Sequence, residues 1–332
     1  MIKVLELFGG IGACTQAFRN LGIIVEIADY VEIDKYAVAS YNAINNTHFE
    51  PQDITKWDKD IDVDVVMHGS PCQDISVVGK GAGADEGTGT RSSLMYETIR
   101  IVNKLKPKVV IWENVKNLLS KKHKHNFDNY LEKMNQLGYN SYYKVLNAKD
   151  YGVPQNRERV FTVSIRKDID KGFEYPTPEE LKVKLKDLLE EKVDEKYYLT
   201  PKQLTYVLDM KDVALKSGRD INNRKVNEDI AKTISCRGAA DQRADITNFV
   251  IENYDHEITV RELKKICRNG LRIRKLTPRE CWRVMSFSDE AFDKAASVNT
   301  KTQLYKQAGN SIVVKVLEKI IWKLYLEYVD FL

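Results

Sequence analysis

Cys72 is the residue whose type and position most directly suggest chemistry. It stands in "HGSPCQDIS" (68–76), directly after a proline and just past the apolar run 63–67, which predicts a buried strand. Open α/β sheets bind their ligands at the carboxyl ends of strands. A thiolate is a strong nucleophile, so Cys72 is a candidate for covalent catalysis. The alternative is an inert buried thiol, the commoner fate of a single cysteine.

Glu113 closes a second apolar run, "VVIWENV" (109–115). An unpaired carboxylate at an apolar strand end is costly, which indicates a function. Because the carboxyl ends of parallel strands meet at one edge of a sheet, we expect Cys72 and Glu113 to face one crevice as nucleophile and proton donor. The glycine-rich segment 79–91 follows Cys72 and is typical of a loop that closes over a site.

A glycine turn near the start of the chain is a candidate nucleotide site. "LFGGIGACTQAF" places Gly9, Gly10 and Gly12 between a predicted strand and a predicted helix. Such a turn lets a ligand approach the backbone and the free N–H groups of the helix. Thr15 stands where a dinucleotide fingerprint has its third glycine, so NAD is only partly supported. A plain tight turn is the alternative.

Two acidic residues extend this candidate site. Glu32 lies at the end of the second predicted strand, about 20 residues after the turn, where a carboxylate can accept both hydroxyls of a ribose. Asp53 follows the next predicted segment, where it can accept an amino hydrogen of adenine. An ordinary turn aspartate explains Asp53 equally well.

The elements that must position these residues alternate between strands and helices. Such alternation predicts an α/β fold with a mainly parallel sheet and helices on both faces. The segments 141–148 and 158–166 predict a closing pair of antiparallel strands, and 311–329 has the apolar spacing of a helix. From Arg166 to about residue 273 the sequence is charged, then polar, irregular and arginine-rich, which indicates a second, smaller domain.

The composition bounds the function classes. With 332 residues, 43% of them hydrophobic, the chain can bury a full core. Its five cysteines form no CxxC pair, so the sequence signals neither a zinc site nor a disulfide framework, and we expect reduced thiols and a cytoplasmic location. No apolar run approaches the ~20 residues of a membrane helix, so we expect no membrane partner.

The net charge of +4 is unevenly distributed. The segment 261–283 holds nine Lys and Arg residues against two Glu, a local charge of +7. This segment is either a docking surface for a polyanion or a solvated basic face.

The motifs, in their order and approximate spacing, resemble the signature blocks of DNA (cytosine-5)-methyltransferases. The resemblance spans nearly the whole chain and rests on six stretches: "ELFGGIGACTQAF", "GSPCQDIS", "ENVKNLL", "QNRERVF", "RKLTPRECWRVMSF" and "QAGNSIVVKVL". It implies a Rossmann-like methyltransferase sheet with helices on both faces, and a smaller, irregular target-recognition domain. The implied catalytic domain comprises 1–175 and 300–332, and the implied DNA-reading domain comprises 176–299.

The resemblance also implies the roles of the catalytic residues. Cys72 resembles the family's nucleophile, which adds to carbon 6 of a cytosine so that carbon 5 can take a methyl group from S-adenosyl-L-methionine. Glu113 resembles the carboxyl that serves the ring nitrogen at position 3, and Arg159 the arginine that binds the ring oxygen. Arg157 would hold the phosphate and the catalytic loop. No metal is implied.

The remaining implied site residues bind the cofactor or the DNA. By resemblance, Glu32 binds the ribose, Asp53 the adenine amino group, and Ile33 and Leu94 sandwich the adenine. The implied cofactor residues are Phe8, Gly10, Gly12, Glu32, Ile33, Asp53, Pro71, Leu94, Asn310 and Ser311. The implied DNA-binding residues are Ser76, Arg91, Thr233, Arg237 and Arg243.

The resemblance thus implies methylation of a short specific sequence in double-stranded DNA after base flipping. We expect a monomer, accompanied or not by a separate cognate restriction endonuclease. Two departures stand out: Glu6 occupies a position where the family more often has aspartate, and Ile33 one where several members have an aromatic ring. The alternatives are a tRNA cytosine-5 methyltransferase, a catalytically silent DNA-binding regulator on the same scaffold and, from another class, a nicotinamide oxidoreductase.

Overall fold

The chain divides into two compact units, which we describe separately. The structure is a computed structural model that describes residues 1–71, 75, 91–208, 225–236, 247–252, 254, 256–266, 272–328 and 330. The first unit comprises Met1–Asn147, Glu158–Glu179 and Ile312–Leu332, and the second comprises Ala148–Arg157 and Glu180–Ser311. This division by contacts groups residues 300–311 with the second unit. The functional domain boundaries expected from the sequence stay a prediction.

The first unit is built on a six-stranded sheet with the strand order β2-β1-β3-β4-β7-β5. Its strands are β1 (Ile2–Leu7), β2 (Val25–Val31), β3 (Val65–His68), β4 (Val109–Val115), β5 (Tyr139–Asn147) and β7 (Glu158–Arg166). Strand β1 pairs in parallel with β2 and β3, and β3 in parallel with β4. Strand β7 runs antiparallel to both β4 and β5, which confirms the predicted mainly parallel sheet with an antiparallel closing pair.

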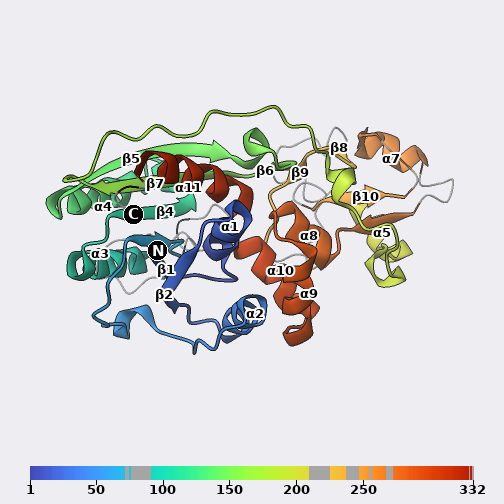
Figure 1. Cartoon of the computed structure of the whole chain (residues 1–332). Coiled ribbons are helices and arrows are strands. Elements are labelled where there is room, and N and C mark those ends of the chain that lie inside the picture. The colour runs from blue at the N-terminus through green and yellow to red at the C-terminus, as the bar shows by residue number, and fades with distance from the viewer. Residues whose placement is uncertain are drawn as a thin grey trace. The chain divides into compact units, whose positions relative to one another are not determined.

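The described residues of the first unit form the helices α1 (Ala13–Leu21), α2 (Lys35–Asn45), α3 (Met95–Leu105), α4 (Lys124–Gln136) and α11 (Val314–Tyr328). Figure 1 shows these helices around the strands of the sheet. Helices α1 and α11 pack against each other, and so do α3 and α4. The predicted helix near the carboxyl end of the chain is therefore confirmed as α11.

The two faces of the sheet are buried by different helices. Side chains alternate along a strand, so Leu5 and Leu7 of β1 point to one face. These two leucines belong to the same hydrophobic core as Ile101 of α3 and Tyr130 of α4. Glu6 lies on the opposite face, where it contacts Thr15 of α1. The sheet is thus covered on both sides, as the sequence predicts.

The second unit contains short strands and short helices. Its strands are β6 (Gln155–Asn156), β8 (Lys225–Val226), β9 (Ala231–Lys232), β10 (Phe249–Ile251), β11 (Ile258–Thr259) and β12 (Ile273–Lys275), and its helices are α5 (Pro201–Leu208), α7 (Val260–Ile266), α8 (Pro278–Val284), α9 (Asp289–Val298) and α10 (Lys301–Asn310). Where the structure describes this unit, the strands pair into the two-stranded sheets β10-β12, β11-β8 and β6-β9. Strands of two or three residues fit the irregular smaller domain that the sequence predicts.

Four arginines of the basic segment 261–283 form ion pairs with carboxylates of the second unit. Arg274 is 5% exposed and forms an ion pair of 2.8 Å with the fully buried Glu280. Arg272 pairs with Glu195 and Glu252, Arg279 with Glu190 and Asp293, and Arg283 with Asp289. These four arginines are thus paired with carboxylates of their own unit, which reduces the charge that the segment 261–283 can offer to a polyanion, and the docking surface itself stays a prediction.

The parallel strands bring four segments to one edge of the sheet. Strands β1, β2, β3 and β4 all end at this edge. Phe8 and Glu32 directly follow β1 and β2, Ser70 and Pro71 come shortly after β3, and Glu113 lies near the end of β4. Among the residues that the structure describes, no helix is long and apolar enough to cross a membrane.

Candidate functional site

The glycine turn joins β1 to α1 and requires unusual backbone angles. Phe8, Gly10 and Gly12 all have positive φ values, of 53°, 56° and 82°. At Gly12, a side chain is also excluded by packing, since an added Cβ would lie 2.8 Å from the ring of Tyr41. At Gly10, by contrast, an added Cβ would meet no atom within 4 Å. The turn therefore leaves open space beside Gly10 at the start of α1.

Glu32 follows β2 directly and reaches this turn. Its carboxylate accepts a hydrogen bond from the Gly10 N–H at 3.1 Å and another from the Asp34 N–H at 2.8 Å. Burial raises the pKa of Glu32 above its ordinary value, although these backbone hydrogen bonds act in the opposite direction. Next to it, the apolar side chain of Ile33 is 68% exposed. A carboxylate and an exposed apolar surface thus lie beside the glycine turn.

Asp53 is positioned by the segment that precedes β3. The Gln52 N–H donates to the Glu32 carbonyl at 2.8 Å, which ties this segment to the end of β2. Asp53 caps a short 3-10 helix (Ile54–Lys56), and its carboxylate accepts from the N–H and the hydroxyl of Thr55 at 3.0 and 2.8 Å. These hydrogen bonds lower the pKa of Asp53. Asp53 is therefore an ionised carboxylate near the end of β2.

Buried Asp29 anchors the same segment. Its carboxylate accepts from the Trp57 indole N–H at 2.7 Å and from the Gln52 amide at 3.2 Å, and pairs with the Lys59 ammonium at 2.8 Å. Asp29 is 2% exposed, so removing it would leave buried donors without a partner. It acts on the candidate site through the chain that carries Asp53.

Ser70 and Pro71 follow β3 and lead to Cys72. Ser70 is buried, and its hydroxyl accepts hydrogen bonds from the Trp112 indole N–H at 3.0 Å and the Asn114 amide at 3.2 Å. The Asn114 amide also donates to the Ser70 carbonyl at 3.2 Å. Two residues of β4 thus fix the segment that leads to the predicted nucleophile.

The Trp112 indole is itself fixed by aromatic neighbours. Its ring stacks on His68 with centroids 5.5 Å apart and lies 4.1 Å from the ring of Tyr130. Burial lowers the pKa of His68 to about 3, so this imidazole is neutral at physiological pH. Since all three rings are buried, the indole N–H is held as a donor toward Ser70.

Glu113 forms the central ion pair of the candidate catalytic edge. Its carboxylate lies 3.0 Å from Nε of Arg159, with side-chain exposures of 11% and 18%. In the register of β4 and β7, Glu113 is opposite Phe161, so Arg159 is its diagonal neighbour on the same face of the sheet. The structure therefore brings together two of the four predicted catalytic residues.

Arg157 belongs to the second unit. It is 3% exposed, and its guanidinium donates to the carbonyls of Ile234 at 3.0 Å, Gly309 at 3.1 Å and Ser311 at 2.8 Å. These contacts join two segments that are more than 70 residues apart. A phosphate contact for Arg157 stays a prediction.

The other predicted residues are placed as follows. Phe8 and Leu94 pack against the same hydrophobic core. Thr233 donates its hydroxyl hydrogen to the Asn156 carbonyl at 2.7 Å, and Asn310 and Ser311 lie at the end of α10 in the second unit. The residues Cys72, Ser76, Arg237 and Arg243, and the side chain of Arg91, lie outside the described part of the chain.

Sequence reasoning missed two positioning groups. Ser70 stands in the quoted "GSPCQDIS", but nothing in that motif indicates its bonds to β4. Asp29 precedes Glu32 by three residues inside an apolar strand, and a buried-strand aspartate is a signal that could have been followed. Within the described residues, no three His, Cys, Asp or Glu side chains cluster closely enough to hold a metal ion.

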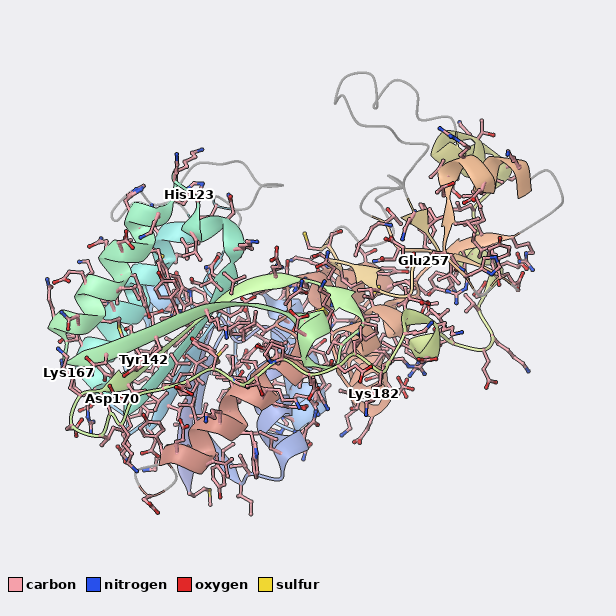
Figure 2. All side chains as sticks on the ribbon, turned by 90° about the horizontal axis from the view of Figure 1, so that it is seen from above. His123, Tyr142, Lys167, Asp170, Lys182 and Glu257 are labelled. Atoms are coloured by element: carbon pink, nitrogen blue, oxygen red, sulfur yellow. The ribbon has the colours of Figure 1, made fainter. Side chains whose placement is uncertain are left out.

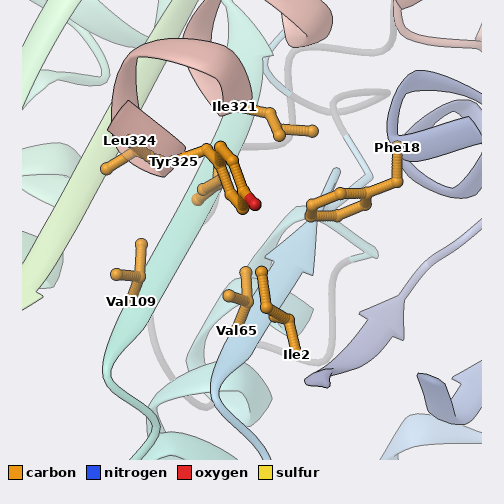
Figure 3. A pocket seen from close by; sticks show the side chains of 8 residues that line it. Ile2, Phe18, Val65, Val109, Ile321, Leu324 and Tyr325 are labelled. Atoms are coloured by element: carbon orange, nitrogen blue, oxygen red, sulfur yellow. The ribbon is translucent and has the colours of Figure 1, made fainter. Parts of the chain in front are cut away.

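A small apolar cavity lies apart from this edge. It has a volume of about 10 Å³ and is lined by eight residues of the first unit, including Phe18, Ile321 and Tyr325 (Figure 3). Ile2, Val65 and Val109 of its lining lie at the starts of their strands, whereas the candidate site lies at the ends. Since a cavity of this size holds one water molecule at most, it is a packing gap rather than a ligand site.

Comparison with known proteins identifies the family. The family model described as C-5 cytosine-specific DNA methylase matches residues 2–325. The chain belongs to this family. The sequence-based prediction of the family is confirmed, and the protein is a DNA cytosine-5 methyltransferase.

Individual relatives agree with this assignment. The type II methyltransferase M2.ScrFI of Lactococcus lactis subsp. cremoris is 38% identical over 281 residues, covering 80% of this chain and 67% of that protein. The type II methyltransferase M.HhaI of Haemophilus parahaemolyticus is 33% identical over 336 residues, covering 97% and 94%. A crystal structure of a Spodoptera frugiperda DNMT2 mutant has the same fold, with a TM-score of 0.75 and 21% identity over 98% of this chain and 100% of that one.

Proposed function

We propose that this methyltransferase uses S-adenosyl-L-methionine to methylate carbon 5 of a cytosine within a short specific sequence of double-stranded DNA, with Cys72 as nucleophile. The observation that carries the proposal is the Glu113–Arg159 pair at the end of β4. A carboxyl and a guanidinium side by side match two neighbouring polar atoms on one edge of a cytosine, its ring nitrogen 3 and its oxygen 2. Two other residues of β4, Trp112 and Asn114, donate hydrogen bonds to Ser70, which precedes Cys72 by two residues.

In the proposed mechanism, the Cys72 thiolate forms a bond to carbon 6 of the cytosine. The electron pair displaced from the 5,6 double bond moves toward nitrogen 3, where Glu113 shares a proton with the ring. Arg159 donates to oxygen 2 and keeps the carboxyl of Glu113 oriented through their ion pair. Carbon 5 then becomes the nucleophilic atom and would take the methyl group that the bound cofactor supplies, with the demethylated thioether of the cofactor as leaving group. Loss of the carbon 5 proton and elimination of the thiolate restore the aromatic ring in the methylated product.

The glycine turn fits S-adenosyl-L-methionine as the cofactor. The open space beside Gly10 accommodates close approach of a ligand to the backbone. Glu32 is the candidate for the ribose hydroxyls, exposed Ile33 for one face of the adenine, and ionised Asp53 for the adenine amino group. The cofactor supplies an already activated methyl group, so the protein has mainly to orient it.

The remaining cofactor assignments are proposals on the same footing. By the resemblance to the family, Phe8, Gly12, Pro71 and Leu94 are assigned to cofactor binding, and Asn310 and Ser311 to its methionine end.

The target cytosine must leave the DNA stack before a thiolate can reach carbon 6. We assign Ser76 and Arg91 to holding the extruded base, and Thr233, Arg237 and Arg243 of the second unit to contacts with DNA. Arginine binds both phosphates and base edges, so these two arginines are proposed for DNA binding in general. We further propose that the enzyme acts in the cytoplasm as a monomer, and that any cognate endonuclease acts separately.

Bisulfite sequencing of plasmid DNA from expressing cells tests the proposal. The wild-type chain is expected to protect the cytosine of one short motif from conversion, and Cys72→Ala to protect none. Cys281→Ala is the matched control, because burial raises the pKa of the Cys281 thiol and keeps it protonated and unreactive.

Each outcome of this experiment tests a different part of the proposed function. Protection that survives Cys72→Ala would show that another group is the nucleophile. If folded wild-type protein protects no cytosine in plasmid DNA, while tRNA from the same cells gains 5-methylcytosine, the DNA substrate is wrong. Equal patterns for the wild type and Cys281→Ala are required for the loss in Cys72→Ala to be assigned to position 72.

A further inference from the structure

Tyr30 of β2 contacts two consecutive residues of the glycine turn. Its ring packs against Gly9 so closely that an added Cβ there would lie 2.6 Å from a ring carbon. Its hydroxyl donates a hydrogen bond of 2.5 Å to the carbonyl of Gly10. Tyr30 is fully buried, so no water competes for this bond. One side chain therefore fixes both the position and the orientation of the turn.

The turn depends on such restraints because its backbone is strained. Phe8 is not a glycine, yet its φ value is 53°, in the left-handed region that costs free energy for residues with a side chain. Conformations of this kind persist only when the surroundings hold them in place. Three hydrogen bonds tie the turn to residues 30–32: Gly9 N–H to the Val31 carbonyl, Gly10 N–H to Glu32, and the Tyr30 hydroxyl to the Gly10 carbonyl. A fourth, from the Gly12 N–H to the Gly9 carbonyl, lies within the turn.

The Tyr30 bond also fixes the direction of a backbone donor. All described peptide bonds are trans, and in a trans peptide the carbonyl and the following N–H point in opposite directions. The Gly10 carbonyl points toward Tyr30, so the Ile11 N–H must point away from it. Glu32, the residue assigned to the ribose, is bonded to the other side of Gly10. Tyr30 and Glu32 thus bind the same residue of the turn, Tyr30 at its carbonyl and Glu32 at its N–H.

Tyr30 is held in place independently of any ligand. Its ring stacks on Tyr41 with centroids 3.8 Å apart, and Phe49 packs beside both rings. The Tyr41 hydroxyl lies 3.0 Å from the hydroxyl of Thr15, at the start of α1. Burial raises the pKa of Tyr30, so its hydroxyl keeps the hydrogen that it donates. The donor is therefore preorganised.

We infer that Tyr30 is a positioning residue for cofactor binding: its hydroxyl holds the Gly10 carbonyl, and through it the backbone donors and Glu32, in the geometry that receives S-adenosyl-L-methionine. This inference rests on the proposed function, which assigns the turn to that cofactor. The hydroxyl is assigned no contact with the cofactor itself.

Titration calorimetry of the full chain with S-adenosyl-L-methionine, without DNA, tests the inference. Tyr30→Phe keeps the ring stacked on Tyr41 and removes only the hydroxyl. The loss of one neutral hydrogen bond is expected to raise the dissociation constant about 5- to 10-fold. At saturating cofactor, we expect kcat and the KM for DNA to stay within about 2-fold of wild type, and the KM for the cofactor to rise with the dissociation constant.

Tyr139→Phe is a closely matched control. The Tyr139 hydroxyl also donates to a backbone carbonyl, that of Pro107, at 2.5 Å, and Tyr139 is also fully buried in the first unit. It lies at the start of β5, opposite the end of β7 and near the start of β4. This edge of the sheet is the one opposite to the glycine turn. Tyr139→Phe should therefore lower the thermal midpoint about as much as Tyr30→Phe and leave the cofactor affinity unchanged.

The outcomes distinguish the inference from the proposed function. If wild type binds the cofactor and Tyr30→Phe binds it equally well, the inference is wrong and the proposed function stands. If both tyrosine variants weaken binding alike, the effect is one of general stability, and the inference is again wrong. If folded wild-type protein does not bind the cofactor, the proposed function fails, and the inference fails with it.

Discussion

Glu6 is a buried carboxyl whose charge should make the stability of the enzyme depend on pH. It is 2% exposed, lies on the face of β1 toward α1, and accepts hydrogen bonds from the N–H of Thr15, at 3.1 Å, and from its hydroxyl. Burial raises the pKa of Glu6 from 4.5 to about 7, while the bonds to Thr15 act in the opposite direction. We predict that Glu6→Gln, a permanently neutral side chain of the same shape, removes this dependence.

The sign and size follow from the two pKa values. Between pH 4.5 and about pH 7 the folded protein holds a proton on Glu6 that the unfolded chain has lost, so the free energy of unfolding falls as the pH rises. Each pH unit in this window costs about 1.4 kcal/mol. From pH 5.5 to pH 8 the wild type should therefore lose about 2 kcal/mol relative to Glu6→Gln. His68, whose pKa is lowered, acts in the opposite direction below about pH 6.5, but it is present in both proteins.

Urea unfolding followed by tryptophan fluorescence measures this difference. Of the four tryptophans, Trp57, Trp112 and Trp322 belong to the first unit, so the signal reports mainly on the unit that contains Glu6. Glu132→Gln is the control, because it removes an exposed carboxylate from α4. A difference between wild type and Glu6→Gln that stays constant from pH 5.5 to pH 8 would refute the reasoning. So would a difference between wild type and Glu132→Gln that changes with pH as much as the difference for Glu6→Gln.

Two further predictions concern activity. Ser70→Ala leaves the buried donors of Trp112 and Asn114 without their hydroxyl acceptor, so the segment that leads to Cys72 should lose its fixed position. The single-turnover methylation rate should therefore fall about 10-fold or more. Ser70→Thr keeps the hydroxyl and should recover most of the rate, whereas equal rates for wild type and Ser70→Ala would contradict this role. Ile33→Trp enlarges an apolar surface that is 68% exposed beside Glu32, so the dissociation constant for S-adenosyl-L-methionine should fall about 3- to 10-fold by calorimetry; unchanged or weaker affinity would show that residue 33 does not face the adenine.

The sheet could be predicted because its signals are local. Strands such as β3 and β4 are short apolar runs, and helix α1 has apolar residues at helical spacing and a clear end at Gly22. The chain order of these elements then leaves few topologies, since parallel strands joined by helices must place their carboxyl ends at one edge. That rule alone predicted, before any contact was known, that Glu113 lies at the same edge of the sheet as the segment that leads to Cys72.

The contacts that hold the site could not be predicted in the same way. Tyr30 and Gly10 are 20 residues apart, and Ser70 and Trp112 are 42 apart. From the sequence, Tyr30 resembles any other apolar residue of a strand. Its position in the two-residue repeat predicts which face of the sheet it lies on, but not the hydrogen-bond partner of its hydroxyl. A hydrogen bond between distant segments depends on the register and twist of neighbouring strands. The residue's own neighbours in the sequence do not determine these.

Arginine shows this limit most clearly, because its sequence signal is charge alone. Arg157 and Arg159 are two residues apart in one motif, yet Arg159 pairs with Glu113 in the first unit, while Arg157 donates to three carbonyls in the second. The four arginines between 272 and 283 are likewise paired with carboxylates of their own unit. A count of positive charges therefore overstates what remains for DNA. The salt dependence of DNA binding by this enzyme should reflect the arginines and lysines that lack carboxylate partners, so its slope should be smaller than the local charge of +7 implies.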